Sequence, residues 1–370
     1  MTVAADPRTR RALQAIAHAR LANQRLAGGG FTRPGDVVSW LGAVQAQDYL
    51  GARWALALRM RRGTDAAIER AFAAGEILRT HVMRPTWHFV APDDIRWMLS
   101  LTAPRVRAAM RSYDRKLGLD AAVITRSHKV IAAALAGGTH LTRQELKTRL
   151  QKAGIVTDGV QRLAHLMMHA ELSGVICSGP IRGRQFTYAL LDERVPEGKS
   201  LSRDAALAEL TRRYFRSHGP AGLQDFVWWS GLTTADARAG LEMVRHELRE
   251  DIVGGRTSSW SSRNARAAAG PRRTAYLLAP YDEYLIAYRD RSAALDGNLW
   301  KSLGEPFSGA IVLDGRVVGG WARTMTNGNV AVSLSVPAPL TSADGRLIVD
   351  AAHRFGSFLG LDVSIARTRG

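Results

Sequence analysis

Residues 77–90 are Ile77-Leu78-Arg79-Thr80-His81-Val82-Met83-Arg84-Pro85-Thr86-Trp87-His88-Phe89-Val90. This run predicts two β-strands around a tight bend. Four helical patterns precede it, near residues 10–27, 34–44, 52–61 and 64–74. The N-terminal part of the chain is therefore expected to consist of short helices that end in a β-hairpin.

The same plan occurs twice more along the chain. Helical patterns near 123–136, 142–153 and 159–172 precede strands at 174–177 and 185–190, with a turn at 179–184. Further patterns near 202–217, 222–229 and 233–247 precede a weaker strand pair at 249–260. Thr142 and Glu145 have the spacing of a capping box. Helices followed by a hairpin are the winged-helix plan, so three tandem winged-helix units are predicted.

The character of the sequence changes beyond residue 260. Residues 256–273 are rich in Ser, Arg, Gly and Ala and are expected to be a mobile basic connector. Strand patterns follow at 275–279, 307–313, 316–322, 329–336 and 362–366, with a helix near 349–359. The predicted fold class is α+β, and the expected domains are a first repeat at 1–120, a second at 121–198, a third at 199–260 and a C-terminal β-barrel-like domain at 261–370.

Composition favours a nucleic-acid partner. The 370 residues contain 51 basic and 33 acidic side chains, and all but six of the basic ones are arginine. Guanidinium groups match phosphate oxygens and guanine edges, although genomic base composition also raises arginine over lysine. The single cysteine, Cys177, excludes an intramolecular disulfide and a multi-cysteine metal site. No apolar run suits a membrane span, so a cytoplasmic, nucleoid-associated protein is expected.

Gln45-Ala46-Gln47 lies between two helical patterns. In an extended segment, residues i and i+2 project from the same side, so both amides reach one substrate if the chain leaves its helix near Val44. Asp48 should then face away and cap the following helix. The alternative is that both glutamines are ordinary solvated connector residues.

Several other side chains suit contact with phosphates and bases. Arg84 and His88 lie at or beside the first hairpin bend, around Trp87. The alternative is that Trp87 faces the core and His88 satisfies a backbone carbonyl. The predicted DNA contacts are Arg182 and Arg184 at the second hairpin tip, then Arg79, Arg84 and His88, and Asn327 in a turn that probes a groove.

His165 and His169 are four residues apart on a predicted helix, which is the spacing of two metal ligands. The intervening residues lack the glutamate of the metalloprotease motif, so two histidines beside a buried face are the expected arrangement. Neither a nucleophile elbow nor a phosphate loop is present. We therefore expect no metal and no cofactor.

Four motifs together carry a resemblance that covers nearly the whole chain. They are Gln45-Ala46-Gln47-Asp48, Arg84-Pro85-Thr86-Trp87-His88-Phe89-Val90, Leu278-Ala279-Pro280-Tyr281-Asp282-Glu283-Tyr284-Leu285-Ile286-Ala287-Tyr288-Arg289-Asp290-Arg291, and Phe307-Ser308-Gly309-Ala310-Ile311-Val312-Leu313-Asp314-Gly315. In this order they resemble the AlkZ family of bacterial DNA glycosylases, in its Gln-x-Gln branch.

The resemblance implies a fold and an activity. It implies three winged-helix units and a β-domain around a DNA-binding channel, with Gln45 and Gln47 as the catalytic residues. It also implies excision of bulky N7-alkylguanine adducts from double-stranded DNA, including unhooking of interstrand crosslinks, in self-resistance to a genotoxic natural product. A monomer is expected.

The chemistry is consistent with two amides. N7-alkylated guanine is already cationic, so its glycosidic bond is weak and the leaving group needs no acid. A neutral amide orients water and supplies a fixed dipole, but it is no general base. No lysine lies beside the motif, which argues against a Schiff-base lyase and for a monofunctional glycosylase. The alternatives are a non-enzymatic DNA-binding regulator or drug-sequestering protein, and a metal-dependent hydrolase at His165 and His169.

Overall fold

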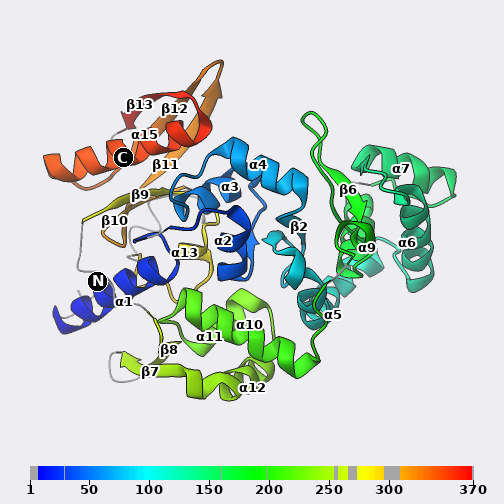
Figure 1. The fold of residues 1–370 in the computed structure, drawn as a ribbon, viewed down its shortest axis with the longest axis horizontal. Coiled ribbons are helices and arrows are strands. Elements are labelled where there is room, and N and C mark those ends of the chain that lie inside the picture. The colour runs from blue at the N-terminus through cyan, green and yellow to red at the C-terminus, as the bar shows by residue number, and fades with distance from the viewer. Residues whose placement is uncertain are drawn as a thin grey trace.

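The computed structural model describes residues 7–28, 30–159, 161–196, 198–253, 257–265, 273–295 and 309–368. Helices and strands are mixed along the chain, which confirms the predicted α+β class. Figure 1 shows the second repeat at one end of the long axis and the C-terminal sheet at the other, with the first repeat between them. None of the described helices is long and apolar enough to cross a membrane.

The first repeat ends in a three-stranded antiparallel sheet of order β1-β3-β2. Its elements are α1 (Pro7–Asn23), α2 (Pro34–Leu41), β1 (Val44–Gln45), α3 (Tyr49–Leu58), α4 (Asp65–Ala74), β2 (Leu78–His81) and β3 (Trp87–Val90). Met83 has a φ of 62° at the hairpin bend, and its N–H donates to Thr102 Oγ1 at 3.1 Å. An unfavourable backbone conformation at the bend is thus held by a side chain from the next helix.

That helix is α5 (Pro92–Lys116), which no sequence pattern above predicted. Pro92 occupies its first turn, where a missing N–H costs nothing, while Pro104 lies inside it. The interior proline interrupts the usual signal of a long helix. α5 leads into the second repeat, so it sets where that repeat lies.

The second repeat builds a sheet of the same form, in the order β4-β6-β5. Its elements are α6 (Ala121–Leu135), β4 (Leu141–Thr142), α7 (Arg143–Lys152), α8 (Arg162–Leu172), β5 (Ile176–Ser178), β6 (Thr187–Leu190) and α9 (Leu191–Arg194). The capping box at Thr142 and Glu145 is present as predicted. Gly183, with a φ of 62°, lies at the hairpin tip.

The third repeat has the same order of elements, but its sheet has two strands instead of three. It contains α10 (Arg203–His218), α11 (Leu223–Ser230), α12 (Thr234–Val244), the 3₁₀ turn η1 (Arg245–Glu247), β7 (Leu248–Val253) and β8 (Thr257–Ser262). A single bridge between Ala221 and Trp260 takes the place of its first strand. β8 occupies part of the predicted basic connector, and residues 256 and 266–272 of that connector lie outside the described residues. The winged-helix assignment and the four domain boundaries stay predictions.

The predicted C-terminal barrel is wrong. The described strands form an open five-stranded sheet of order β13-β12-β11-β10-β9, with β13 and β9 at its edges. Its elements are β9 (Ala275–Leu278), α13 (Glu283–Ile286), β10 (Ala310–Leu313), β11 (Arg316–Thr326), β12 (Asn329–Ser335), α15 (Ser342–Leu359) and β13 (Asp362–Thr368). Residues 307 and 308 of one predicted strand lie outside the described residues.

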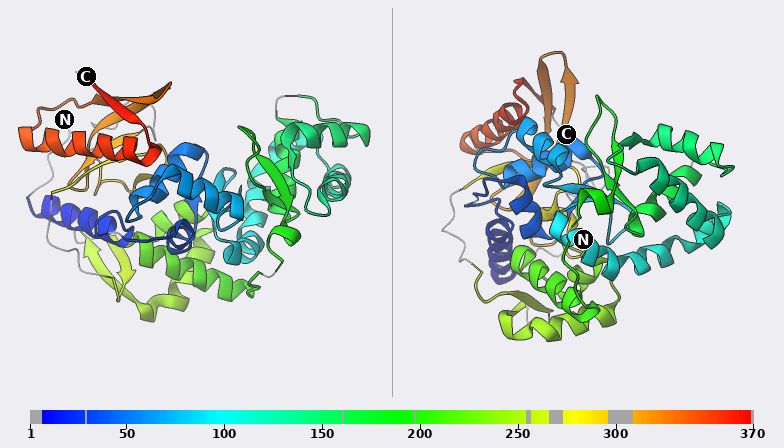
Figure 2. Two further views of the ribbon diagram at one scale, coloured as in Figure 1. Left: turned by 45° about the horizontal axis from the view of Figure 1, so that its top comes forward. Right: turned by 45° about the vertical axis from the view of Figure 1, so that its right-hand side comes forward.

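The sheet stays open because other elements bury its apolar face. Phe355 of α15 packs edge-on against both Trp54 of α3 and Trp321 of β11. Trp54 also donates its indole N–H to Leu277 O at 2.6 Å. One apolar core therefore includes the first repeat and the C-terminal sheet, and Figure 2 shows these two parts packed side by side.

Candidate active site

The Gln45–Gln47 segment is a joint between two helices, as the sequence predicted. α2 ends at Leu41, and Gly42 follows with a φ of 83°, its N–H donating to Val38 O at 2.9 Å. β1 then contains Gln45, and α3 begins at Tyr49. Only glycine adopts the Gly42 conformation easily, so this residue ends the helix and turns the chain into the strand.

Three hydrogen bonds fix the backbone of this joint. Gln45 N–H donates to Glu283 Oε1 at 2.9 Å, and Ala46 N–H donates to Trp87 O at 2.7 Å. Arg79 Nε donates to Ala46 O at 3.0 Å. The peptide groups around Ala46 are thus held from two sides by the hairpin and from a third by the C-terminal part of the chain.

The two glutamine side chains differ in exposure. Gln45 is only 6% exposed, and its Oε1 accepts a hydrogen bond from Arg84 Nη2 at 3.2 Å. Because guanidinium only donates, this contact assigns the amide oxygen to Arg84 and leaves the amide NH₂ as the group available to donate elsewhere. Gln47 is exposed to solvent. The segment therefore presents one restrained carboxamide and one solvent-facing carboxamide.

His88 is fully buried behind Gln45, so its ring has no exposed surface for the DNA contact that the sequence predicts. His88 pairs with Gln45 across the sheet, and its Nδ1 lies 2.9 Å from Thr86 O. A carbonyl only accepts, so Nδ1 carries the proton and Nε2 faces Arg84 Nη2 at 3.5 Å as an acceptor. Burial, and then the Arg84 charge, lower the His88 pKa well below its usual value. His88 is a neutral support for Arg84, close to the alternative that the sequence left open.

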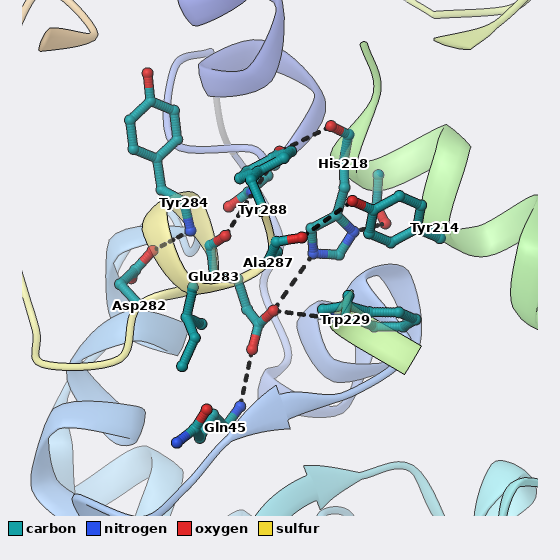
Figure 3. Close-up of polar contacts among 12 residues, drawn as sticks. Gln45, Tyr214, His218, Trp229, Asp282, Glu283, Tyr284, Ala287 and Tyr288 are labelled. Carbon is teal, nitrogen blue, oxygen red and sulfur yellow. Dashed lines mark hydrogen bonds and ion pairs between the residues drawn. The ribbon is translucent and has the colours of Figure 1, made fainter. Parts of the chain in front are cut away.

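Glu283 was not singled out by sequence reasoning, although it lies in one of the quoted motifs. It is completely buried in α13, and Figure 3 shows its carboxylate directed at Gln45, Trp229 and His218. Besides the Gln45 N–H, it accepts from Trp229 Nε1 at 3.0 Å, and His218 Nε2 lies 3.6 Å away. An acidic residue beside the apolar run Tyr284-Leu285-Ile286-Ala287 is the signal that would have found it.

Glu283 lies beside His218 in the buried core of the site. Ser217 Oγ donates to Arg213 O at 2.7 Å, so it accepts from His218 Nδ1–H at 2.8 Å, and burial lowers the His218 pKa. Burial opposes ionisation of Glu283, but the contacts with His218 and the Gln45 N–H outweigh it, so the Glu283 pKa lies below its usual value. The carboxylate form is therefore the acceptor of the Gln45 N–H.

Asp48 has the bracing position that the sequence predicted. Its side chain caps α3 by accepting from Gly51 N–H at 3.1 Å. Arg323 of β11 donates to both Asp48 oxygens, at 3.0 and 2.8 Å. The residue directly after Gln47 is thus tied to the β11–β12 hairpin, which carries Asn327 at its exposed tip.

The predicted DNA-binding arginines fall into two groups. Arg182 and Arg184 are exposed at the β5–β6 tip, where Arg182 forms an ion pair with Glu145 of α7. Arg79 is only 8% exposed, with its guanidinium over the rings of Trp87 at 4.2 Å and Phe186 at 4.7 Å. A direct phosphate contact does not fit this buried position. The ring contacts and the hydrogen bond to Ala46 O give Arg79 a structural role instead.

His165 and His169 bind one carboxylate. His165 Nδ1 lies 2.9 Å from Asp114 Oδ1, and His169 Nε2 lies 3.0 Å from Asp114 Oδ2. Across the described part of the chain, no group of three or more His, Cys, Asp or Glu side chains is arranged to hold a metal ion. The pair connects α8 to α5, so its geometry does not favour the metal-hydrolase alternative.

A basic chain with three helix–hairpin repeats, one restrained carboxamide and one solvent-facing carboxamide has the features of a DNA-processing enzyme. A family model described as "DNA glycosylase AlkZ-like" matches residues 38–358. The chain therefore belongs to the AlkZ-like DNA glycosylase family, and it is an enzyme of that class.

A curated protein and a solved structure, both from Streptomyces sahachiroi, are similar to this chain. A curated protein named "Interstrand DNA cross-link repair glycosylase" is 29% identical over 307 residues, covering 77% of this chain and 81% of that protein. The solved structure "Streptomyces sahachiroi DNA glycosylase AlkZ" has a TM-score of 0.79 at 25% identity, covering 96% of this chain and 99% of that one. The likeness therefore includes the C-terminal sheet as well as the repeats.

Proposed function

We propose that this glycosylase excises bulky N7-alkylguanine adducts from double-stranded DNA, including adducts that join the two strands, in self-resistance to a genotoxic natural product. The Gln-x-Gln motif and the name of the curated relative support this substrate class. The observation that carries the proposal is the backbone clamp around Ala46, which holds Gln45 still while Gln47 faces solvent.

The geometry suits positioning rather than proton transfer. Gln45 is held by Arg84, so its NH₂ group is oriented to donate to the sugar or to an attacking water. Gln47 then orients that water from the exposed side. His88 is fully buried with Nε2 facing Arg84, so its ring is not placed to exchange a proton with the substrate. Neither amide takes a proton at neutral pH.

The reaction balances without an added acid. Water forms a bond to C1′ of the sugar, and the C1′–N9 bond breaks with its electron pair passing to the base. These electrons neutralise the positive charge of the alkylated purine, and water releases its proton to solvent. The requirement for a cationic leaving group restricts such an enzyme to substrates that alkylation has already activated.

DNA binding is proposed to use the exposed tips of two hairpins. Arg182, Arg184 and Asn327 lie on the β5–β6 and β11–β12 tips, and Arg84 lies beside Gln45. The expected form is a monomer on chromosomal DNA. The non-enzymatic alternative, a regulator or drug-sequestering protein, is disfavoured because the family consists of DNA glycosylases.

The test is a single-turnover excision assay on a duplex with one bulky N7-alkylguanine. Gln45→Ala and Gln47→Ala should each lower the excision rate by about a hundredfold or more, the usual cost of removing a pre-oriented polar group. Melting temperature and affinity for undamaged DNA should change little for Gln47→Ala, whose side chain is exposed. Wild-type rates in both variants would refute the assignment.

A further inference from the structure

A pocket lies between the first and second repeats. It is a pocket of about 430 Å³, and its walls include Arg79, Trp87, Arg143, Arg184, Phe186 and Tyr188. The first two belong to β2 and β3, and the others to α7 and the β5–β6 hairpin. Glu171 of α8 holds this junction by accepting from Trp87 Nε1 at 3.4 Å and pairing with His81.

The pocket adjoins the Gln-x-Gln segment directly. Arg79 in its wall donates to Ala46 O, and Trp87 O accepts the Ala46 N–H. Ala46 is the residue between the two glutamines. Two residues in the wall of the pocket are therefore hydrogen-bonded to the residue that precedes Gln47.

The lining is aromatic and cationic. Phe186 is 36% exposed, with the edge of Tyr49 at a centroid distance of 4.8 Å and the Arg79 guanidinium over its ring. Arg143 and Arg184 add two positive charges, and Arg143 Nε is buried without a hydrogen-bond partner among the described residues. None of the residues that line the pocket, all within the described ranges, is acidic.

We propose that this pocket binds one unpaired nucleotide of the DNA, with its base against Phe186 and its phosphate against Arg143 and Arg184. A flat ring and an anion on the same ligand match the two kinds of side chain present. The volume is within the range of small-ligand sites. Extruding one nucleotide here opens the duplex beside Gln47 and exposes the sugar of the neighbouring lesion.

The inference rests on the DNA substrate of the family and not on the adduct class of the proposed function. It can therefore be tested on undamaged DNA. The probes are a short, fully paired duplex and the same duplex with one bulged adenine, and the measurement is the dissociation constant of each by fluorescence anisotropy. A bulged nucleotide is already unpaired, so the protein avoids the cost of extruding it.

Wild-type protein should bind the bulged duplex about tenfold more tightly than the paired one, as expected for one base stacked on an aromatic ring. Phe186→Ala and Phe186→Leu should remove this preference, whereas Phe186→Tyr should keep it. The leucine variant fills the space without a flat ring, so it separates stacking from packing. Tyr113→Ala removes an exposed ring that does not line the pocket, and it should keep the preference.

Arg143→Ala should weaken binding of the bulged duplex more than binding of the paired one, since its phosphate contact forms only with an occupied pocket. Equal affinities of wild-type protein for the two probes would overturn the proposal. A preference that survives in Phe186→Leu would also overturn it. Loss of N7-adduct excision with the bulge preference intact would contradict the proposed function alone.

Discussion

The first and second repeats both build a three-stranded antiparallel sheet. They differ in how the chain passes from the first strand of that sheet to the next helix. In the second repeat, β4 ends at Thr142, which is also the N-cap of α7, so strand and helix meet without a linker. In the first, β1 ends at Gln45, and Ala46 and Gln47 come before the N-cap Asp48. Residues 46 and 47 are thus a two-residue extension of a joint that the second repeat makes without one.

The two joints also differ in what holds them. In the second repeat the N–H of Thr142 donates to Glu145 Oε2 at 2.7 Å, three residues away on the same exposed helix. In the first, the N–H of Gln45 donates to the buried Glu283, 238 positions away. In both repeats a carboxylate accepts the N–H at the end of the first strand, but only in the first repeat does that carboxylate come from a distant part of the chain. The Gln45 joint therefore depends on long-range packing, whereas the Thr142 joint depends only on neighbouring residues.

The largest effect is expected from a substitution that removes this long-range contact. Glu283→Ala leaves the Gln45 N–H, the Trp229 indole and His218 without their shared acceptor, and it should cost about 3–5 kcal/mol of unfolding free energy. Excision should fall together with stability. Urea unfolding and single-turnover kinetics measure the two effects.

The matched control is Glu283→Gln, which keeps the volume and one acceptor oxygen. It should retain more stability than Glu283→Ala while still lowering the excision rate, because only one of the two donors keeps its acceptor. Full activity and full stability in Glu283→Ala would show that the first joint needs no outside acceptor.

A smaller effect compares helix caps in the two repeats. Asp48→Ala removes both the α3 cap and the ion pair with Arg323, and it should cost about 1–2 kcal/mol and slow excision by displacing Gln47. Asp120→Ala removes the α6 cap, in which Asp120 accepts from Val123 N–H at 2.8 Å, and should cost about 1 kcal/mol. Excision should be unchanged in Asp120→Ala, and equal slowing in both variants would refute the link from Asp48 to Gln47.

The two hairpins should respond differently to mutation. His88→Ala, in the first hairpin, removes the ring beside the Arg84 guanidinium while Arg84 keeps its contact with Gln45, and it should lower the excision rate more than the DNA affinity. Arg184→Ala, in the second, should weaken DNA binding and reduce the slope of log affinity against log salt by about one, as for one lost phosphate contact. If both variants lost DNA affinity by the same factor and with the same salt dependence, His88 and Arg184 would have the same role in DNA binding, and the distinction between the two hairpins would be refuted.

The smallest expected effect is the pH dependence of the stability that Glu145 contributes to the second repeat. Hydrogen bonds from the Thr142 backbone, the Thr142 hydroxyl and Arg182 lower the Glu145 pKa to about 2. Because the folded-state pKa is depressed, the stabilisation is present above the ordinary value near 4.5 and is lost as pH falls toward 2. The difference in melting temperature between wild type and Glu145→Gln should therefore narrow from pH 5 to pH 3. A constant difference would show that Glu145 acts by packing alone.

Much of the architecture was accessible from local patterns. The hairpins of the repeats and most of their helices depend on residues close in sequence and were predicted, as were the Thr142 capping box, the exit of the chain from α2 before Gln45 and the capping role of Asp48. The helix α5 and the short strands β1 and β4 were not predicted. The barrel was wrong because strand patterns do not reveal that Phe355 and Trp54 cover one face of the sheet. Burial of His88 and Arg79 was missed because it depends on packing between repeats.

Glu283 has a consequence for the order in which the protein becomes functional. Gln45 is made early, but the carboxylate that accepts its backbone N–H emerges only after more than 280 residues have been synthesised. A chain that stops before residue 283 carries Gln45 without that acceptor. Full ordering of the joint therefore waits until the C-terminal part of the chain has been made and has packed against the first repeat.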